Sequence, residues 1–368
     1  MHASVLFLST FAVLTLASYP YLPARETCNQ TYYEQSFTIL QIPDMHYTGN
    51  SSHFCRGAPR DPCSESNMTI FLNTLLDQVK PDFIVYTGDQ VENQENQDQV
   101  KTAIDAYSAP AIARRIPWAM VFGNHDEGDS MNRKEMLDYI AQKPYSHTHF
   151  GPADIGGVGN YEIDIKDHAN TSVFRMYFID TGNSGGVSVG QNQYLQQLAA
   201  SHEAVPAVLF AHIPIPEYIL SENETLKYGH QGERVSAGPQ SGLFDTLVKM
   251  GDVKAMFVGH DHDNNYCVER SRIQLCYGGG SGYGAAYNLA KAPRNARVIQ
   301  WQRDSNGPSI STWMQVDNDY TKNEYPLFGY KKDCLSSFKE SQPRKSTANS
   351  NQYITVLAFF ITLFVLLH

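Results

Sequence analysis

Short apolar runs recur along the chain, and segments with apolar positions at helical spacing separate them. Five of the runs are predicted to be buried strands, at residues 39–42, 83–86, 118–122, 207–210 and 255–258. Helical patterns over residues 66–79 and 94–113 separate the first three runs, with Ser66 as the expected N-cap of the first helix. This alternation of strands and helices predicts a parallel sheet with covering helices.

The second half of the chain predicts a further sheet of more antiparallel character. Its expected helices lie at residues 131–142, 191–201 and 242–250. Its expected strands lie at 161–165, 173–179, 297–302 and 309–316, with a hairpin at 266–277. We therefore expect one domain over residues 36–320, with a short lead (18–35) before it and a polar linker (321–352) after it.

Each of the five buried runs ends in polar residues that can bind metal or transfer protons. These residues are Asp44 and His46, Asp89, Asn124 with His125 and Asp126, His212, and His260 with His262. In sheets with parallel strands, ligand sites lie just beyond the carboxyl ends of the strands. Packing alone explains five such strand ends poorly, so we expect these side chains to form one site.

The donors in this set indicate a centre of two metal ions. The candidate ligands are Asp44, His46, Asp89, Asn124, His212, His260 and His262. Nitrogen and oxygen donors without cysteine suit zinc, iron or manganese. Seven ligands are too many for one ion, but they fit two ions about 3.5–4 Å apart that share one carboxylate. Such a pair of ions supplies hydroxide for attack on a phosphoryl group. His125 is then the candidate general acid for the leaving alkoxide, and Asp126 could orient it.

The order of these motifs resembles the calcineurin-like metallophosphoesterases. The matching segments are Asp44-x-His46, Gly88-Asp89, Gly123-Asn124-His125-Asp126, His212 and Gly259-His260-x-His262. The resemblance implies an α/β fold, a four-layer α-β-β-α sandwich of two mixed sheets flanked by helices. It also implies a first metal held by Asp44, His46, Asp89 and His262, and a second held by Asp89, Asn124, His212 and His260.

Within that family, the chain resembles the short purple-acid-phosphatase-like group of fungi and plants. The similar segments are residues 121–128, 257–262 and 275–280. True purple acid phosphatases carry a metal-binding tyrosine three residues after the shared aspartate, where this chain has Glu92. They also lack a histidine at the position of His46. We therefore expect no iron–tyrosinate colour.

Several loop residues are weaker candidates for contact with a substrate. They are Tyr47, His147, His149, Asn160 and Tyr218. Glu217 is a further candidate, for orienting His212 from behind. The formal net charge of −10 and the short, scattered Lys/Arg pairs predict that nucleic acid is not a partner.

Both ends of the chain resemble export signals. Residues 5–16 form an apolar run too short to span a bilayer, which predicts a signal peptide over residues 1–17. The apolar tail (353–368) resembles a GPI-attachment signal, with a single-pass membrane anchor as the alternative. We expect the protein in the secretory pathway, at the extracellular face of the cell membrane or secreted.

Cysteines and glycosylation sequons fit export. The preferred pairings of the six cysteines are Cys55–Cys63, Cys267–Cys276 and, for the remaining two, Cys28–Cys334. The Asn-x-Ser/Thr sequons are at Asn29, Asn50, Asn67, Asn170 and Asn223.

These patterns together predict a secreted or cell-surface enzyme that hydrolyses phosphate monoesters with two metal ions. A phosphodiesterase similar to acid sphingomyelinase is the first alternative, because such relatives share the same metal ligands. An inactive surface or adhesion protein on the same fold is the second. That alternative would need a broken ligand set, whereas all the expected ligands and His125 are present.

Overall fold

The computed structural model describes residues 21–29, 32–55, 63–92, 96–283, 293–317, 319 and 321–329 of the 368-residue chain. The expected signal peptide, the apolar tail and the linker beyond residue 329 lie outside the described residues. Within the described ranges, no helix is both long and apolar enough to cross a bilayer.

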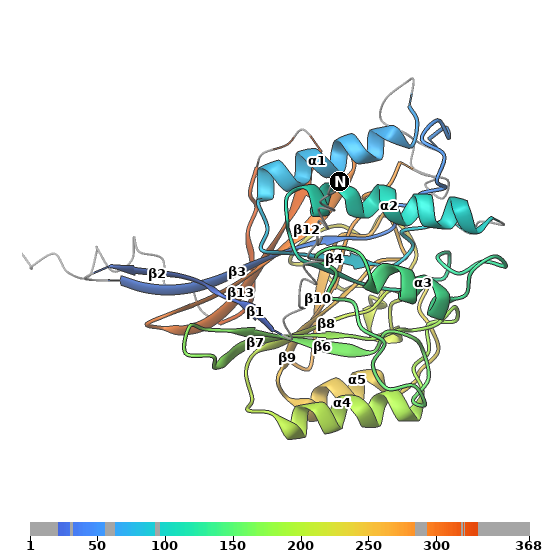
Figure 1. Cartoon of the computed structure of the whole chain (residues 1–368). Helices are drawn as coiled ribbons and strands as arrows, with labels where there is room; N and C mark the ends of the chain where they lie inside the picture. The colour runs from blue at the N-terminus through green and yellow to red at the C-terminus, as the bar shows by residue number, and fades with distance from the viewer. Residues whose placement is uncertain are drawn as a thin grey trace, which may run out of the picture. The chain divides into compact units, whose positions relative to one another are not determined.

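Two seven-stranded sheets form the centre of the domain (Figure 1). The first runs in the order β1 (Tyr21–Pro23), β6 (Tyr161–Lys166), β7 (Ser172–Phe178), β8 (Ala207–Phe210), β9 (Val253–Val258), β11 (Ile273–Tyr277) and β10 (Cys267–Arg270). The second runs in the order β14 (Tyr325–Phe328), β13 (Gly307–Val316), β12 (Asn295–Asp304), β3 (Tyr32–Ile42), β4 (Phe83–Thr87) and β5 (Trp118–Val121), with β2 (Arg25–Asn29) paired to β3. Both sheets contain parallel and antiparallel neighbours, so both are mixed.

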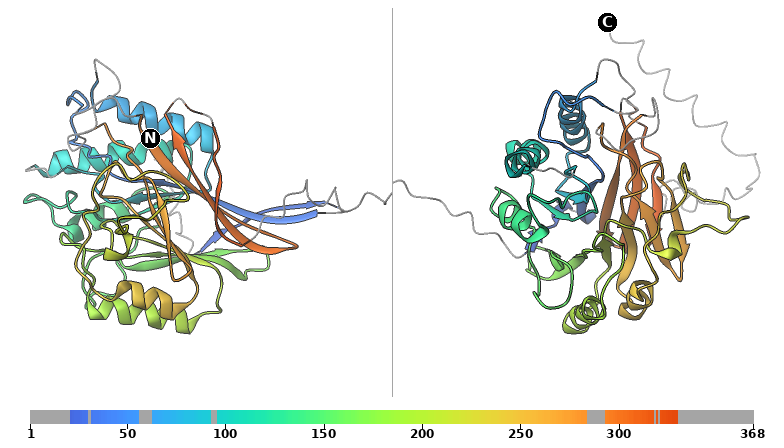
Figure 2. Two further views of the ribbon diagram at one scale, coloured as in Figure 1. Left: turned by 180° about the vertical axis from the view of Figure 1, so that it is seen from behind. Right: turned by 90° about the vertical axis from the view of Figure 1, so that its right-hand side faces the viewer.

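Helices cover the outer face of each sheet. The helices α1 (Ser66–Val79), α2 (Gln97–Ala113) and α3 (Arg133–Ala141) share one apolar core with the second sheet. The helices α4 (Val189–Ser201) and α5 (Leu243–Met250) share another core with the first sheet. A third core fills the space between the sheets. Figure 1 and the left-hand view of Figure 2 show α1 and α2 above the strands and α4 and α5 below them. The predicted four-layer α-β-β-α sandwich is confirmed.

The parallel strands place the candidate ligands at one edge. β3, β4 and β5 are parallel neighbours in the second sheet, and β8 and β9 are parallel neighbours in the first. Hydrogen bonds join the two sets of strand ends. Gln41 Nε2 of β3 donates to the carbonyl of Val258 at the end of β9, at 3.0 Å. The five strand ends identified in the sequence therefore meet across the junction of the two sheets.

The ordered domain extends further at both ends than the apolar pattern predicts. The expected lead contributes β1 and β2, and Leu22 of β1 is buried against the core between the sheets. The expected linker contributes β14, in which Leu327 is buried and Tyr325 stacks on Tyr228 at 4.9 Å. Strands this short carry too few residues for an alternating pattern, and β1 also pairs with the distant β6, a contact that is not visible in the sequence.

The start of α1 also differs from the prediction. Ser66 is the first helical residue, and Glu65 occupies the N-cap without a side-chain capping bond. The Glu65 carboxylate accepts hydrogen bonds from the backbone N–H and the hydroxyl of Thr48 instead, both at 2.6 Å. This carboxylate ties the loop after His46 to the start of α1.

Two of the three expected disulfides are present. Cys55 pairs with Cys63, and Cys267 of β10 pairs with Cys276 of β11. The third pairing, Cys28–Cys334, involves side chains outside the described part of the structure. Among the sequons, Asn50, Asn170 and Asn223 are exposed and Asn67 is half-buried, while the side chain of Asn29 is not described. Glycosylation stays a prediction.

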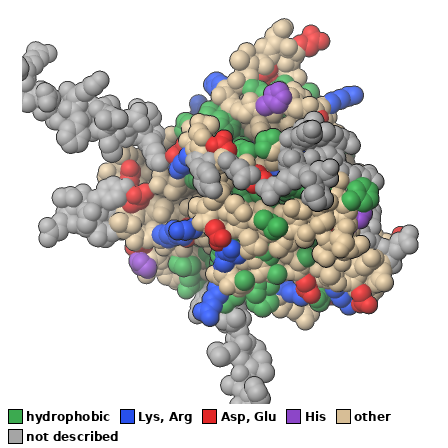
Figure 3. Space-filling model, turned by 90° about the horizontal axis from the view of Figure 1, so that it is seen from above, with side chains coloured by type: hydrophobic (Ala, Val, Ile, Leu, Met, Phe, Trp, Pro, Cys, Tyr) green, Lys and Arg blue, Asp and Glu red, His purple; other side chains and the backbone are tan. Residues whose placement is uncertain are grey.

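The surface above α1 and α2 carries charges of both signs. Figure 3 shows basic and acidic side chains interspersed on this face, without an extended basic patch among the side chains that the structure describes. The expectation that nucleic acid is not a partner stays a prediction.

Candidate metal centre

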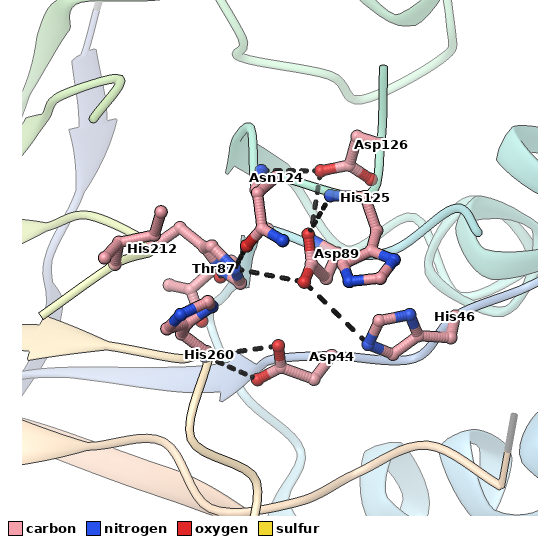
Figure 4. Close-up of polar contacts among 12 residues, drawn as sticks. Asp44, His46, Thr87, Asp89, Asn124, His125, Asp126, His212 and His260 are labelled. Atoms are coloured by element: carbon pink, nitrogen blue, oxygen red, sulfur yellow. Dashed lines mark hydrogen bonds and ion pairs between the residues drawn. The ribbon is translucent and has the colours of Figure 1, made fainter. Parts of the chain in front are cut away.

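The side chains predicted as metal ligands converge at the sheet junction (Figure 4). Among the described residues, three groups of donors have ligand atoms within 4.8 Å of one another; one is His46, Glu92 and His125, and the other two contain only predicted ligands. Of these two, the first group is Asp44, His46 and His262, and the second is Asp89, His212 and His260. These groups correspond to the two metal positions that the family resemblance implies.

Asp89 lies between the two groups. Its Oδ2 atom is 3.1 Å from His212 Nε2 and 3.9 Å from His46 Nε2. Its Oδ1 atom accepts the backbone N–H of His125 at 2.7 Å. Asn124 joins the second group, since its Oδ1 atom is 3.2 Å from His212 Nε2. One carboxylate within reach of both groups is the arrangement that two ions sharing a ligand require.

Two of the histidines are held from behind. His212 Nδ1 is 2.8 Å from the carbonyl oxygen of Thr87, and His46 Nδ1 is 2.7 Å from Glu92 Oε2. Because these oxygens accept hydrogen bonds, each Nδ1 carries the proton and each Nε2 faces the centre with a lone pair. Such contacts fix the ring orientation of metal-binding histidines.

The backbone at the site adopts unusual conformations. Asp44, His46, Asp89 and His260 have φ values of 54°, 51°, 50° and 75°. Non-glycine residues are uncommon in this left-handed region, and such strain gathers at functional sites where the surrounding structure enforces it. Four of the seven candidate ligands share this feature.

Glycines at the strand ends make room for ligands from neighbouring strands. A Cβ atom added at Gly123 would overlap the carboxylate of Asp89. A Cβ atom added at Gly88 would lie 2.4 Å from His212 Nδ1. At both positions a larger residue would collide with a candidate ligand from another strand, so glycine is required for packing as well as for the turn.

The structure corrects the role expected of Asp126. Its buried carboxylate accepts four backbone N–H groups, from Gly123 at 2.7 Å and from residues 89, 90 and 91 at 2.9 Å each. Asp126 thus fixes the backbone that carries Asp89 and does not orient the His125 ring. Glu92 orients that ring instead, since Glu92 Oε1 is 3.1 Å from His125 Nδ1.

Glu92 is a functional residue that the sequence reasoning missed. The sequence marked two departures from purple acid phosphatases, Glu92 and His46, and the structure makes them partners. One carboxylate holds both His46 and His125, so the ligand and the candidate acid share a support. The paired departures were the available signal for this contact.

Charge and burial set the protonation of the candidate acid. The hydrogen bond to Glu92 raises the pKa of His125 to about 9, although burial opposes this shift. Burial raises the pKa of Glu92, but hydrogen bonds to His125 and His46 outweigh it and lower the pKa to about 2. At neutral pH, His125 is therefore protonated and Glu92 ionised. The His125 side chain is 37% exposed, so a substrate can reach it.

The weaker candidates for substrate contact are mostly buried. Tyr47, Asn160 and Tyr218 are at most 1% exposed. The hydroxyl of Tyr218 donates to the carbonyl of Met256 at 2.9 Å, and Asn160 Oδ1 accepts the backbone N–H of Asp180 at 3.1 Å. Burial leaves these three side chains no surface for a substrate, so their expected role was wrong.

The remaining loop candidates make contacts away from the ligand groups. His147 is 8% exposed and packs edge-on against Phe83, while His149 is exposed and packs against Tyr161. The expectation for Glu217 was also wrong. Glu217 accepts a hydrogen bond from Gln240, and Thr87 is the group that orients His212.

The residues present fit a pair of metal ions. His46 Nε2 and His262 Nε2 lie 3.4 Å apart, and a bound cation satisfies two ring nitrogens that face each other in this way. Asp44 and Asp89 are at most 1% exposed, and buried carboxylates require compensating positive charge. The donor set of carboxylate, amide and imidazole suits zinc, iron or manganese without choosing among them.

Fold and site together define a class of protein. The profile of the calcineurin-like phosphoesterases matches residues 37–264, and the chain belongs to this family. The fold is similar to that of a solved dimetal phosphatase from Danio rerio. The two structures align over 80% of this chain and 99% of the Danio rerio chain, with a TM-score of 0.53 and 15% sequence identity. This similarity supports the fold alone.

Curated relatives place the chain near the purple-acid-phosphatase-like group, as the sequence predicted. "Probable inactive purple acid phosphatase 29" of Arabidopsis thaliana is 34% identical over 77% of this chain and 83% of that protein. "Phosphatase DCR2" of Saccharomyces cerevisiae is 30% identical in an alignment that covers 77% of this chain and 54% of that protein.

Proposed function

We propose that this protein is a dinuclear-metal phosphomonoesterase. The observation that carries the proposal is Asp89 Oδ2, which lies within reach of both ligand groups. His125, whose side chain is partly open to solvent, stands directly beside these groups, with its ring 5.0 Å from that of His46. Ligands for two ions and an acid for the leaving group are the requirements for hydrolysis of a phosphate ester.

The protein's own residues supply orientation and a proton. Metal ions bound at the two groups would activate water and neutralise charge on the phosphoryl oxygens. Glu92 occupies Nδ1 of His125, so Nε2 is the nitrogen that can donate to the oxygen of the leaving alcohol. After donation, the Glu92 carboxylate keeps the ring in position for the proton to return.

A catalytically inactive protein is the alternative from another class, and the name of the Arabidopsis thaliana relative raises it. The intact ligand set and the oriented His125 favour activity in this chain. The test is metal analysis of the purified protein beside hydrolysis of 4-nitrophenyl phosphate. Bound metal together with turnover supports the proposal. Metal-loaded protein without turnover would support the alternative, a catalytically inactive protein.

A phosphodiesterase is the second enzymatic candidate, since the same ligand set serves both reactions. The comparison of 4-nitrophenyl phosphate with bis(4-nitrophenyl) phosphate distinguishes the two. A higher kcat/KM on the monoester supports our proposal, and a higher value on the diester would replace it.

We also propose export to the cell surface or beyond it. The disulfides Cys55–Cys63 and Cys267–Cys276 suit an oxidising compartment. Treatment of intact cells with a phosphatidylinositol-specific phospholipase tests the lipid anchor. Release of the protein from the cells supports the lipid anchor. Retention on the cells would favour a membrane-spanning tail, once an acylated anchor that resists the phospholipase has been excluded.

A further inference from the structure

A cavity of about 350 Å³ lies beside the metal centre. Its lining combines the buried Arg133 and Asp180 with Glu127, Lys134, Val158 and Asn183, which are exposed or half-buried. This volume is near the lower end of the ~300–1,000 Å³ range of small-molecule sites. The cavity therefore suits a group of about one ring rather than a large ligand.

The cavity walls are tied to the segments that carry the candidate ligands. Arg133 Nη2 donates to the carbonyl of Gly123 at 2.7 Å, and Gly123 directly precedes Asn124. Arg133 also pairs with Asp180, which follows β7, the parallel neighbour of the strand that ends before His212. The lining thus adjoins the backbone on either side of the second ligand group.

The position of the acid indicates what lies beyond it. The leaving oxygen must reach Nε2 of His125, because Glu92 occupies Nδ1. The organic part of the ester extends from that oxygen, away from the metal ligands. Glu127, two residues after His125, is part of the cavity lining. The bond from Arg133 to Gly123 and the position of Glu127 bring the lining to the segment that carries His125, which is the ground for assigning the cavity to the leaving group.

We propose that this cavity binds the alcohol portion of the substrate and that the alcohol is rich in hydroxyl groups, as in a sugar or polyol phosphate. The inference rests on the proposed phosphomonoesterase function and names its substrate class. It assigns the cavity residues to specificity, not to the chemical step.

The chemistry of the lining supports a neutral, hydroxylated group. Arg133 uses four of its five N–H donors on Glu127, Asp180, Asn183 and Gly123, which leaves one Nη1 hydrogen without a partner among the described residues. Lys134 likewise has no hydrogen-bond or ion-pair partner within the described ranges. Hydroxyl groups of a ligand can accept from both donors.

Two other kinds of alcohol fit the lining less well. Val158 is the only apolar side chain in it, so an acyl chain would bury little apolar surface there. Arg133 and Lys134 balance the charges of Glu127 and Asp180, so the cavity offers no net charge for a second anionic group. Lipid phosphates and bisphosphates are therefore the disfavoured classes.

Gly182 allows a side chain to be added at the cavity without a steric clash. Gly182 belongs to the lining, has a φ of +63°, and a Cβ atom added there would meet nothing within 4 Å. Asparagine tolerates this left-handed conformation, so Gly182→Asn should fold. Gly251→Asn is the matched control, since Gly251 ends α5 with a φ of +74° and has equally open surroundings.

The first test compares a hexose 6-phosphate with methyl phosphate. Both release an alkoxide and need the same acid, but only the hexose is large enough to occupy the cavity. For the wild-type enzyme we expect kcat/KM at least tenfold higher on the hexose phosphate. Gly182→Asn should remove this preference mainly through KM, Lys134→Ala should reduce it, and Gly251→Asn should leave it unchanged.

A second test uses binding alone. A hexose phosphonate, which is not hydrolysed, should bind the wild type more tightly than methylphosphonate in calorimetry, and Gly182→Asn should abolish the difference. Equal binding of both phosphonates, or equal kcat/KM on both esters, overturns the cavity assignment. Metal-loaded enzyme that hydrolyses no ester overturns the proposed function instead, so the two failures are distinguishable.

Discussion

Glu92 connects the candidate acid to a metal ligand, and replacing it by glutamine isolates that connection. Glu92→Gln keeps the size and shape of the side chain but removes its charge. The carboxylate now accepts from both His46 Nδ1 and His125 Nδ1. A glutamine side chain has one acceptor oxygen and one donor nitrogen, so it can satisfy only one of these rings in its present tautomer.

The size of the effect follows from the bond that is lost. A hydrogen bond to a charged group contributes roughly 1.5–3 kcal/mol. If the His46 bond is retained and the His125 bond is lost, transition-state stabilisation falls by this amount, which corresponds to a roughly 10- to 150-fold lower kcat. The loss should appear on substrates whose leaving oxygen requires a proton.

The assay compares kcat on an alkyl phosphate and on 4-nitrophenyl phosphate, whose leaving group needs little protonation. We expect a 10- to 150-fold loss on the alkyl ester, as derived above, and a loss of less than about threefold on the nitrophenyl ester. Glu217→Gln is the control, because that carboxylate contacts Gln240 in the loop after β8. Equal losses on the two esters, with metal content unchanged, would refute the role given to Glu92.

Three further predictions concern the metal centre and the buried histidine. Asp89→Asn should lower bound metal, measured by elemental analysis, and abolish turnover, because the shared ligand is lost; full metal content would contradict the bridging role. Gly123→Ala should also deplete metal, since its Cβ would overlap Asp89, and a fully loaded variant would contradict that packing argument. Burial lowers the pKa of His147 to about 4, below the value of about 6.5 in the unfolded chain. The unfolded chain therefore binds the proton first as the pH falls, so the free energy of unfolding decreases between pH 6.5 and pH 4. Denaturation of wild type and His147→Gln at pH 7 and pH 4 should show the wild type losing up to about 3 kcal/mol more, and equal losses would show that His147 does not resist protonation.

The sequence allowed the candidate ligands to be placed together because each one follows a strand. Parallel strands end at a common edge, so placing Asp44, Asp89, Asn124, His212 and His260 in one site needed only the strand positions and their direction. The sandwich followed from the family resemblance. The same reasoning could not place the strands at the ends of the domain, since β1 pairs with the distant β6 and β14 is only four residues long.

Side-chain roles within the loops were harder to predict. Asp126 is adjacent to His125 in sequence, but its carboxylate turns inward to four backbone N–H groups. Tyr47 and Tyr218 belong to loops by position and to the core by burial. Adjacency along the chain does not determine which way a loop side chain points. The loops after the neighbouring strands β3, β4 and β5 bring Glu92 to His46 and His125.

The origin of the ligands from both sheets has a consequence for the durability of the enzyme. Metal held by Asp44 and Asp89 from one sheet and by His212 and His260 from the other would act as a cross-link between the two halves of the sandwich. A ligand that binds only the folded state adds about 2.7 kcal/mol to stability at 100 times its dissociation constant. Removal of metal would also leave the buried, like-charged carboxylates of Asp44 and Asp89 without a compensating cation. A chelator should therefore lower the free energy of unfolding as well as stop turnover. The supply of metal would then determine what fraction of the protein stays folded.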